Sequence, residues 1–173
     1  MRALFVGRFQ PFHNGHMEAI KHILSKCDSL IVLVGSSQKC YEPENPFTVG
    51  ERIEMIERSL SEEKLLGKCL ILSIPDIMNN ALWVNHIDSL VPHYDIAYSN
   101  NALTKRLFSE AGKKVAEIPF FTRSHFDGTK IRAAMLKGSD EWRKSVPKAA
   151  ALFIDKLKAV ERIRAVADGD KNA

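Results

Sequence analysis

The sequence lacks any long apolar run, and none of its hydrophobic stretches approaches the roughly 20 residues that a transmembrane helix requires. Its three cysteines, Cys27, Cys40 and Cys69, form no CxxC pair of the kind that binds metal. Their odd number, with no signal peptide, indicates reduced thiols. Met1 leads almost directly into an apolar run, which leaves no room for a targeting segment. We therefore expect a cytoplasmic protein that does not enter a membrane.

Several catalytic motifs are also absent. The chain contains neither the GxxxxGK[ST] of a P-loop nor the GxGxxG of a dinucleotide fingerprint. No Ser-His-Asp or Cys-His arrangement can be defended from the spacing. These absences argue against hydride transfer and against a covalent intermediate.

The chain also has only a small excess of one sign of charge. The 173 residues include 25 basic and 21 acidic side chains, for a net charge of +4. This excess is too small and too interspersed for nucleic-acid binding, although it suits a small anionic substrate. The length and the 45% hydrophobic content predict one domain over residues 1–173, with a frayed polar tail at 168–173.

Short apolar runs alternate with segments of helical periodicity. The predicted strands are Ala3–Val6, Leu30–Gly35, Leu70–Ile74, Ile96–Tyr98 and Val115–Ile118. The predicted helices between them are Met17–Lys26, Val49–Leu60, Leu82–Leu90 and Leu103–Ala111. This alternation predicts an α/β fold, a doubly wound, Rossmann-like parallel sheet with helices on both faces.

The C-terminal third reads differently. Residues 119–127 are predicted to form a loop, and a helical segment follows, with helices at about 128–137, from Pro147 to about Ala159, and on to Ala167.

Thr48 and Glu51 form a capping-box pattern, and Gly112 and Gly138 stand where helices should end.

The segment from Gly7 to His16, GRFQPFHNGH, carries the strongest chemical signal. It joins the first predicted strand to the first helix, and it places His13 and His16 three residues apart on one helical face. A helix N-terminus favours anions, and Arg8 adds charge. The alternative is that both histidines are structural. Gly15, which lets a backbone approach a ligand closely, favours the phosphate site.

A second basic segment follows Asp127. Thr129 and Arg132 are three residues apart at another predicted helix start, and arginine offers a planar fork for phosphate oxygens. A carboxylate at position 127 would repel phosphate. Asp127 therefore either caps the helix and points away or acts through a bound metal.

These motifs resemble the HxGH nucleotidylyltransferase superfamily, and the archaeal-type nicotinamide mononucleotide (NMN) adenylyltransferases in particular. GSSQ at 35–38, NPFTVGER at 45–52, NALWV at 80–84, GTKIR at 128–132 and VERI at 160–163 are similar to blocks of that family in its order. The chain departs from it at four positions: Asp127 replaces a usual serine, Lys130 a glutamate, Asn100 a glycine and Ala102 a proline. Asn100 tolerates left-handed backbone angles, so we expect the turn there to form.

The resemblance implies specific roles. His13, His16, Arg8 and Arg132 would be catalytic. The nucleotide would contact Gly7, Phe9, Gly15, Asn101, Gly128, Thr129 and Ile131. NMN would contact Gly35, Ser36, Asn80 and Trp83, with the Trp83 indole stacked on the nicotinamide ring. From the residues alone, Trp83 is equally readable as a core side chain.

The implied reaction transfers the adenylyl group of ATP to the 5′-phosphate of NMN, giving NAD and pyrophosphate. Mg²⁺ would arrive with ATP, since no carboxylate cluster suggests a protein metal site. The resemblance also implies a homo-oligomer, a hexamer in particular. Two alternatives remain: a sister adenylyltransferase acting on phosphopantetheine or FMN, and a nucleotide-sensing protein without turnover. Selectivity between NMN and its deamidated acid form stays open.

Overall fold

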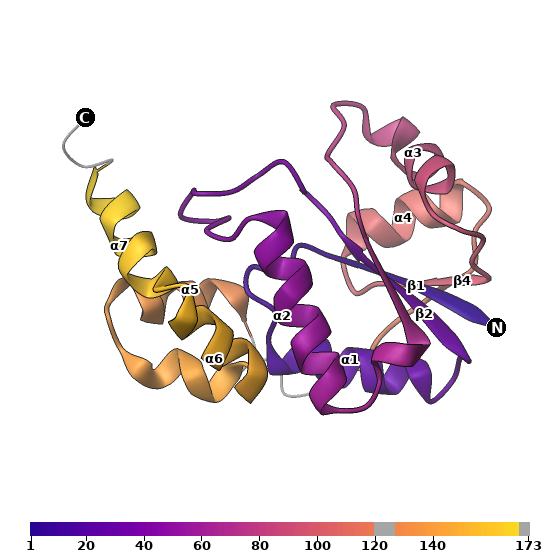
Figure 1. Cartoon of the computed structure of the whole chain (residues 1–173). Helices are drawn as coiled ribbons and strands as arrows, with labels where there is room; N and C mark the ends of the chain where they lie inside the picture. The colour runs from indigo at the N-terminus through magenta and orange to yellow at the C-terminus, as the bar shows by residue number, and fades with distance from the viewer. Residues whose placement is uncertain (120–126, 170–173) are drawn as a thin grey trace.

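The computed structural model describes residues 1–119 and 127–169, and its centre is a five-stranded parallel sheet (Figure 1). The strand order is β3-β2-β1-β4-β5. The strands are β1 (Arg2–Gly7), β2 (Ser29–Val34), β3 (Cys69–Ser73), β4 (Ile96–Tyr98) and β5 (Val115–Ala116). The chain moves outward from β1 to one edge and then to the other, which confirms the doubly wound fold predicted from the sequence.

Alternate residues of the central strands face opposite layers of helices. Leu4 pairs with Ile31 and faces one buried cluster, while Phe5 pairs with Val32 and faces the other. The helices α1 (Asn14–Leu24) and α2 (Val49–Glu62) contribute to the cluster that contains Phe5. The helices α3 (Trp83–Leu90) and α4 (Ala102–Glu110) contribute to the cluster that contains Leu4. Both faces of the sheet are therefore covered, as predicted.

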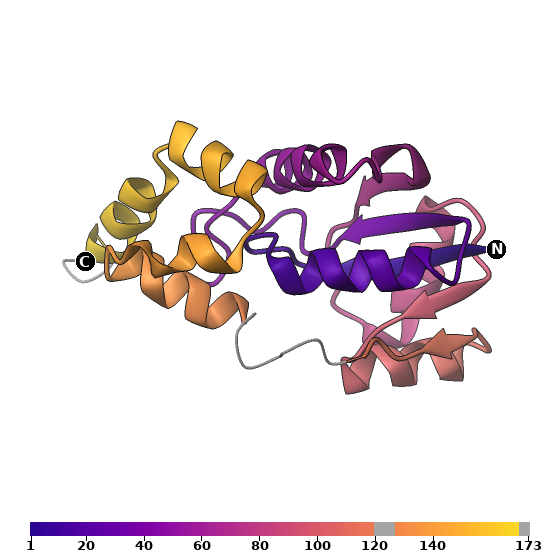
Figure 2. The same cartoon turned by 90° about the horizontal axis from the view of Figure 1, so that it is seen from below.

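The C-terminal helices lie at the end of the molecule opposite the N-terminus (Figures 1 and 2). They are α5 (Gly128–Leu136), η3 (Asp140–Ser145), α6 (Lys148–Lys156) and α7 (Ala159–Gly169). The 3₁₀ segment η3 was not predicted; Ser139 caps it by accepting a hydrogen bond from the N–H of Glu141. The loop predicted at 119–127 falls mostly outside the described residues.

Local capping signals decide where several helices begin and end. The Thr48–Glu51 capping box is present, and both Gly112 (φ 71°) and Gly138 (φ 69°) adopt left-handed angles after helices, as predicted. Helix α1 begins at Asn14, three residues before the predicted start at Met17. The prediction began too late because the first turn of the helix is polar and carries no apolar periodicity. Helix α7 continues to Gly169, into the predicted tail.

Two further short 3₁₀ segments lie before β3 and α3, η1 (Leu66–Lys68) and η2 (Asn80–Leu82).

Within residues 1–119 and 127–169, no helix has the length and apolar content needed to cross a membrane. The same described residues contain no group of three or more side chains arranged to hold a metal ion.

Candidate active site

The two basic motifs meet at a cavity of about 200 Å³ beyond the carboxyl end of β1. Its lining joins the β1–α1 loop to the start of α5, more than a hundred residues later. The lining residues are Arg8, Phe9, Gln10, Pro11, His13, His16, Asp127, Gly128, Thr129 and Arg132. Seven of the predicted site residues are therefore brought together, at the strand end where ligands bind in open α/β sheets.

His13 and His16 lie face to face at the start of α1. Their rings are nearly parallel, with centroids 3.5 Å apart. His13 is the N-cap residue, and its main-chain N–H donates a hydrogen bond to Nδ1 of His16 at 3.2 Å. Because Nδ1 accepts this bond, the neutral ring of His16 carries its proton on Nε2.

Aromatic side chains surround His16. The ring of Phe9 meets it edge-on at 4.7 Å between centroids, and the ring of Phe12 stacks at 5.6 Å. Burial, with a smaller contribution from His13, lowers the pKa of His16 well below its usual 6.5. Burial likewise lowers the pKa of His13 to about 4, with Asp127 opposing and Arg132 adding to the shift. Both rings are therefore neutral near pH 7.

Gly7 is required by the conformation of its neighbour. Phe9 adopts a left-handed backbone angle (φ 52°), which folds its ring back over the end of β1. A Cβ on Gly7 would lie 2.8 Å from Cζ of that ring, closer than real Cβ atoms come. Gly7 thus allows Phe9 to turn back toward His16.

Arg132 is held by the β1–α1 loop. Its Nη1 donates to the main-chain oxygen of Gln10 at 2.7 Å, and its Nη2 donates to Oγ1 of Thr129 at 3.4 Å. Burial, followed by the charge of Arg8, lowers the pKa of Arg132, but a guanidinium stays charged at neutral pH. A Cβ on Gly128 would lie 3.1 Å from Nη1, so glycine leaves the room that this side chain needs.

Asp127 caps α5. Its Oδ1 accepts a hydrogen bond from the N–H of Thr129 at 2.8 Å. The residue still lines the cavity and acts on His13 electrostatically, so it does not point fully away from the site. The capping role is confirmed, and a role through metal stays a prediction.

The predicted NMN residues near β2 flank this cavity without lining it. The N–H of Gly35 donates to the main-chain oxygen of Gly7 at 2.9 Å, which places the two strand ends side by side. Ser36 adopts a left-handed angle (φ 51°), and its hydroxyl donates to Asp76 at 3.0 Å.

Asn80 and Trp83 lie on the segment that follows β3. Asn80 is exposed at the start of η2, and Trp83 is half-buried at the start of α3. The Trp83 indole meets the Phe108 ring edge-on, with centroids 5.5 Å apart. Trp83 therefore packs against the second core cluster while part of its surface stays open.

Three further predicted residues also lie outside the cavity lining. Gly15 is the second residue of α1, Asn101 caps α4 by accepting from the N–H of Thr104, and Ile131 is buried in the core. The expected left-handed turn at Asn100 is absent. Its side-chain amide instead exchanges two hydrogen bonds with the main chain of Ile118, at 2.7 and 2.9 Å.

Gln10 and Arg52 organise the site, although no functional role was predicted for either residue from the sequence. The buried amide of Gln10 donates to the oxygen of Phe47 at 2.9 Å and accepts from its N–H at 3.0 Å. Arg52, fully buried, donates to main-chain oxygens of both strand-end loops, including Arg8 at 3.0 Å and Gly35 at 2.8 Å. The available signal was an arginine on the apolar face of α2, at helical spacing from Met55 and Ile56.

Comparison with known proteins adds independent information. The sequence profile of the cytidylyltransferase-like family matches residues 4–151. The chain is 47% identical over 174 residues to a nicotinamide-nucleotide adenylyltransferase from Archaeoglobus fulgidus, covering 98% of this chain and 99% of the relative. It is 45% identical over 171 residues to the enzyme of that name from Picrophilus torridus, covering 99% and 100%.

A solved structure shares the fold. The bifunctional NMN adenylyltransferase/ADP ribose pyrophosphatase of Francisella tularensis, complexed with AMP and a manganese ion, aligns with a TM-score of 0.72 at 21% identity. The alignment covers 95% of this chain and 52% of that one, so this chain corresponds to about half of the bifunctional protein. With the two curated relatives matched along nearly their whole length, this chain belongs to the nicotinamide-nucleotide adenylyltransferase family, within the cytidylyltransferase-like group.

Proposed function

We propose that this protein transfers the adenylyl group of ATP to the 5′-phosphate of NMN, forming NAD and releasing pyrophosphate. The observation that carries the proposal is the cavity in which two neutral histidines meet a buried arginine at the carboxyl end of β1. The names of the curated relatives supply the two substrates.

The site suits a reaction that needs no strong base. The attacking NMN phosphate is already an anion near neutral pH, and a histidine with a pKa of about 4 is a weak base there. Catalysis then depends on aligning two anions and stabilising charge on the transferring phosphoryl group. This requirement fits fixed donors and cations better than proton abstraction.

Each catalytic residue has a distinct task in this proposal. His16, with its proton on Nε2, donates a hydrogen bond to an α-phosphate oxygen of ATP. His13 contacts the same phosphate chain. Arg132 and Arg8, which both line the cavity, supply positive charge to the phosphate chain.

Each of the remaining predicted residues is assigned to contact either ATP or NMN. Phe9, Gly128 and Thr129 line the cavity and bind ATP. The assignment of Gly7, Gly15, Asn101 and Ile131 to ATP rests on the family resemblance alone. NMN lies toward the ends of β2 and β3, against Gly35, Ser36, Asn80 and Trp83. The partly open face of Trp83 is available to stack on a nicotinamide ring.

A divalent cation, Mg²⁺ in the first instance, would enter with ATP. Among the described residues that line the cavity, Asp127 is the one carboxylate, which fits a metal carried by the nucleotide rather than one held by a protein cage. Bound Mg²⁺ would neutralise charge on the triphosphate.

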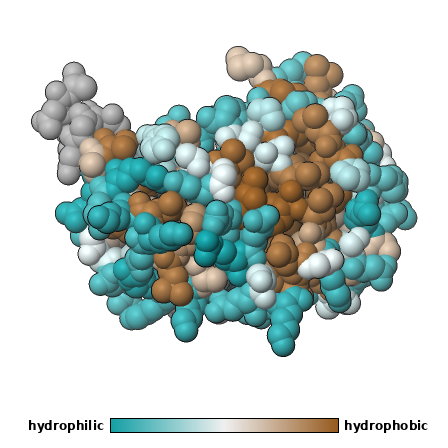
Figure 3. Space-filling model, viewed as in Figure 1, coloured by the Kyte–Doolittle hydropathy of each residue, from teal (hydrophilic) through white to brown (hydrophobic). Residues whose placement is uncertain are grey.

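We also propose a single domain and a homo-oligomer. One buried cluster runs from Phe5 in the sheet to Ile163 in α7, which supports a single folding unit. Figure 3 shows apolar residues gathered over the region of β3 and the segment leading to α3, where Leu70, Met78 and Leu82 are exposed. An apolar surface of this kind at a sheet edge suits contact between copies. The predicted hexamer and the cytoplasmic location stay predictions.

The decisive experiment incubates the protein with ATP, Mg²⁺ and NMN and measures NAD with alcohol dehydrogenase. Nicotinic acid mononucleotide, phosphopantetheine and FMN are tested in parallel, with products separated by chromatography. NAD formation supports the proposal, and the acid arm measures selectivity. ATP binding without product from any acceptor would instead support a nucleotide sensor, whereas product from phosphopantetheine or FMN alone would support a sister enzyme.

A further inference from the structure

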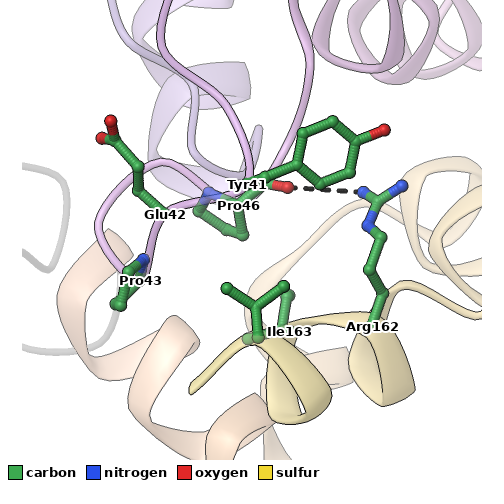
Figure 4. Close-up of a pocket in the computed structure, with 7 residues that line it drawn as sticks. Tyr41, Glu42, Pro43, Pro46, Arg162 and Ile163 are labelled. Carbon is green, nitrogen blue, oxygen red and sulfur yellow. Dashed lines mark hydrogen bonds between the residues drawn. The ribbon is translucent and has the colours of Figure 1, made fainter. Parts of the chain in front are cut away.

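Arg162 connects the C-terminal helix α7 to the loop that follows β2. It lies beyond residues 4–151, which match the wider family profile. Its Nη1 donates to Oε1 of Glu51 at 2.7 Å, and its Nη2 donates to Oε2 of Glu51 at 2.8 Å. Nη2 also donates to the main-chain oxygen of Pro46 at 3.3 Å, the bond drawn in Figure 4. One guanidinium thus holds a helix start and the loop before it.

Glu51 is shared between two structural tasks. Its Oε2 also accepts the N–H of Thr48 at 3.0 Å, as part of the capping box of α2. Burial raises the pKa of Glu51, but the bonds from Arg162 and Thr48 outweigh it, so the pKa lies below its usual value. The carboxylate is therefore charged at neutral pH, and the pair with Arg162 is bidentate.

The segment from Pro46 to Thr48 is consequently held at each residue in turn. Arg162 binds the oxygen of Pro46, Gln10 binds both the N–H and the oxygen of Phe47, and Glu51 binds the N–H of Thr48. The main-chain oxygen of Gln10 in turn accepts the bond from Arg132 in the phosphate cavity. A continuous series of hydrogen bonds and one short chain segment therefore links α7 to the cavity.

We propose that Arg162 is a positioning residue for the ATP site: by fixing Pro46–Thr48 against Gln10, it sets the geometry in which Arg132 meets the phosphate chain. The pair is well placed for this role, since its side chains are only 24% and 14% exposed and solvent screens them less than a surface ion pair. Arg162 also lies over the ring of Tyr41 at 5.0 Å, which further restricts its position. Misplacing a phosphate-binding group by about 1 Å can reduce a rate by about 100-fold.

The test compares Arg162→Met and Arg162→Lys with Arg143→Met as the matched control. Arg143 likewise forms ion pairs, in its case with Asp140 and Asp155, and it lies on η3 with no hydrogen bond to the 46–48 segment among those of the described residues. Calorimetry measures the Kd for ATP, kinetics measure kcat and both KM values, and melting measures Tm. The binding and kinetic measurements are made well below the lowest Tm.

For Arg162→Met we expect ATP binding about tenfold weaker and an equal rise in the KM for ATP, with the KM for NMN nearly unchanged. Arg162→Lys, which keeps the charge but cannot bind Glu51 bidentately and Pro46 together, should recover part of the loss. Arg143→Met should leave ATP binding unchanged. If Arg162→Met does not fold, Glu51→Gln removes the ion pair while keeping its volume, and it should weaken ATP binding in the same way.

Two results would overturn the proposal. A lower Tm with unchanged Kd and KM for ATP would show that Arg162 only stabilises the fold. Equal weakening by Arg143→Met would show a general effect of losing an ion pair. The kinetic arm depends on the proposed adenylyltransferase function, but the ATP-binding arm does not. Failure of the wild type to form NAD while it still binds ATP would therefore count against that function and not against Arg162.

Discussion

The main-chain N–H of His13 donates a hydrogen bond to Nδ1 of His16, and this bond determines which nitrogen of His16 can donate. With Nδ1 used as an acceptor, Nε2 carries the proton of the neutral ring. Burial among Phe9 and Phe12 keeps the ring neutral near pH 7. The site therefore presents His16 as a fixed hydrogen-bond donor rather than as a cation or a base.

Replacing His16 with Ala should lower kcat by roughly 10²–10³-fold, the usual effect of removing one transition-state donor. Binding of ATP, measured by calorimetry, should change much less. His93→Ala, at an exposed histidine, is the control and should leave kcat unchanged. Near-normal turnover in the His16 variant would contradict the role assigned here.

Replacing Trp83 with Ala should raise the KM for NMN and leave the KM for ATP nearly unchanged, because the proposed stacking partner of the nicotinamide is lost. Trp83→Phe retains an aromatic ring that can still meet Phe108, so it should fall between the wild type and the Ala variant. Initial-rate kinetics with each substrate varied will measure both constants. An unaltered dependence on NMN would identify Trp83 as a core residue alone.

Acid should destabilise the fold through His13. Its pKa is about 4 in the folded protein and about 6.5 when unfolded, so between these values the unfolded chain binds a proton that the folded chain does not. The neutral state of His13 therefore contributes roughly 3 kcal/mol to the free energy of unfolding. This contribution is complete above about pH 6.5 and is lost as the pH falls toward 4. Urea unfolding across this pH range should show a smaller loss in the free energy of unfolding for His13→Gln than for the wild type. Identical pH dependence in both proteins would mean that folding does not lower the pKa of His13.

Replacing Gln10 with Ala should weaken both stability and ATP binding. The change leaves the N–H and the oxygen of Phe47 without their partner, at about 1–3 kcal/mol for each group that stays buried and unpaired. Gln10→Glu places a buried carboxylate oxygen against the main-chain oxygen of Phe47, so its loss of stability should be at least as large as that of the Ala variant. Urea unfolding and ATP calorimetry measure the two effects. An unchanged free energy of unfolding and an unchanged Kd for ATP would show that the hydrogen bonds between Gln10 and Phe47 are dispensable.

Replacing Asp127 with Ser should lower the KM for ATP by about two- to fivefold, because a partly solvated negative charge leaves the phosphate cavity. Serine and asparagine both cap helices well, so Asp127→Ser and the isosteric Asp127→Asn should retain the stability of α5. Kinetics at several Mg²⁺ concentrations provide the measurement. A raised KM for ATP with an altered Mg²⁺ requirement would show instead that Asp127 acts through the metal.

The sequence determined the parts of this protein that depend on local pattern. Short continuous apolar runs located the strands, and apolar patterns of period 3.6 located the helices. The Thr48–Glu51 box and Gly112 marked helix ends. Parallel strands with right-handed crossovers bring their carboxyl ends to one edge. The family resemblance assigned His13 and Arg132 to one catalytic site, and both residues line the same cavity at this edge.

The contacts that hold the site form between segments that are far apart in the sequence, so they exist only in the folded chain. Arg132 binds Gln10 across 122 residues of chain, and Arg162 binds Glu51 across 111. Asn100, where a left-handed turn was expected, instead binds Ile118 through its side chain. Such contacts leave no periodic signal, because a polar side chain finds its partner only after the core has placed the two segments together. The neutral state of both histidines has the same origin, since burial sets their pKa values and burial is a property of the folded chain.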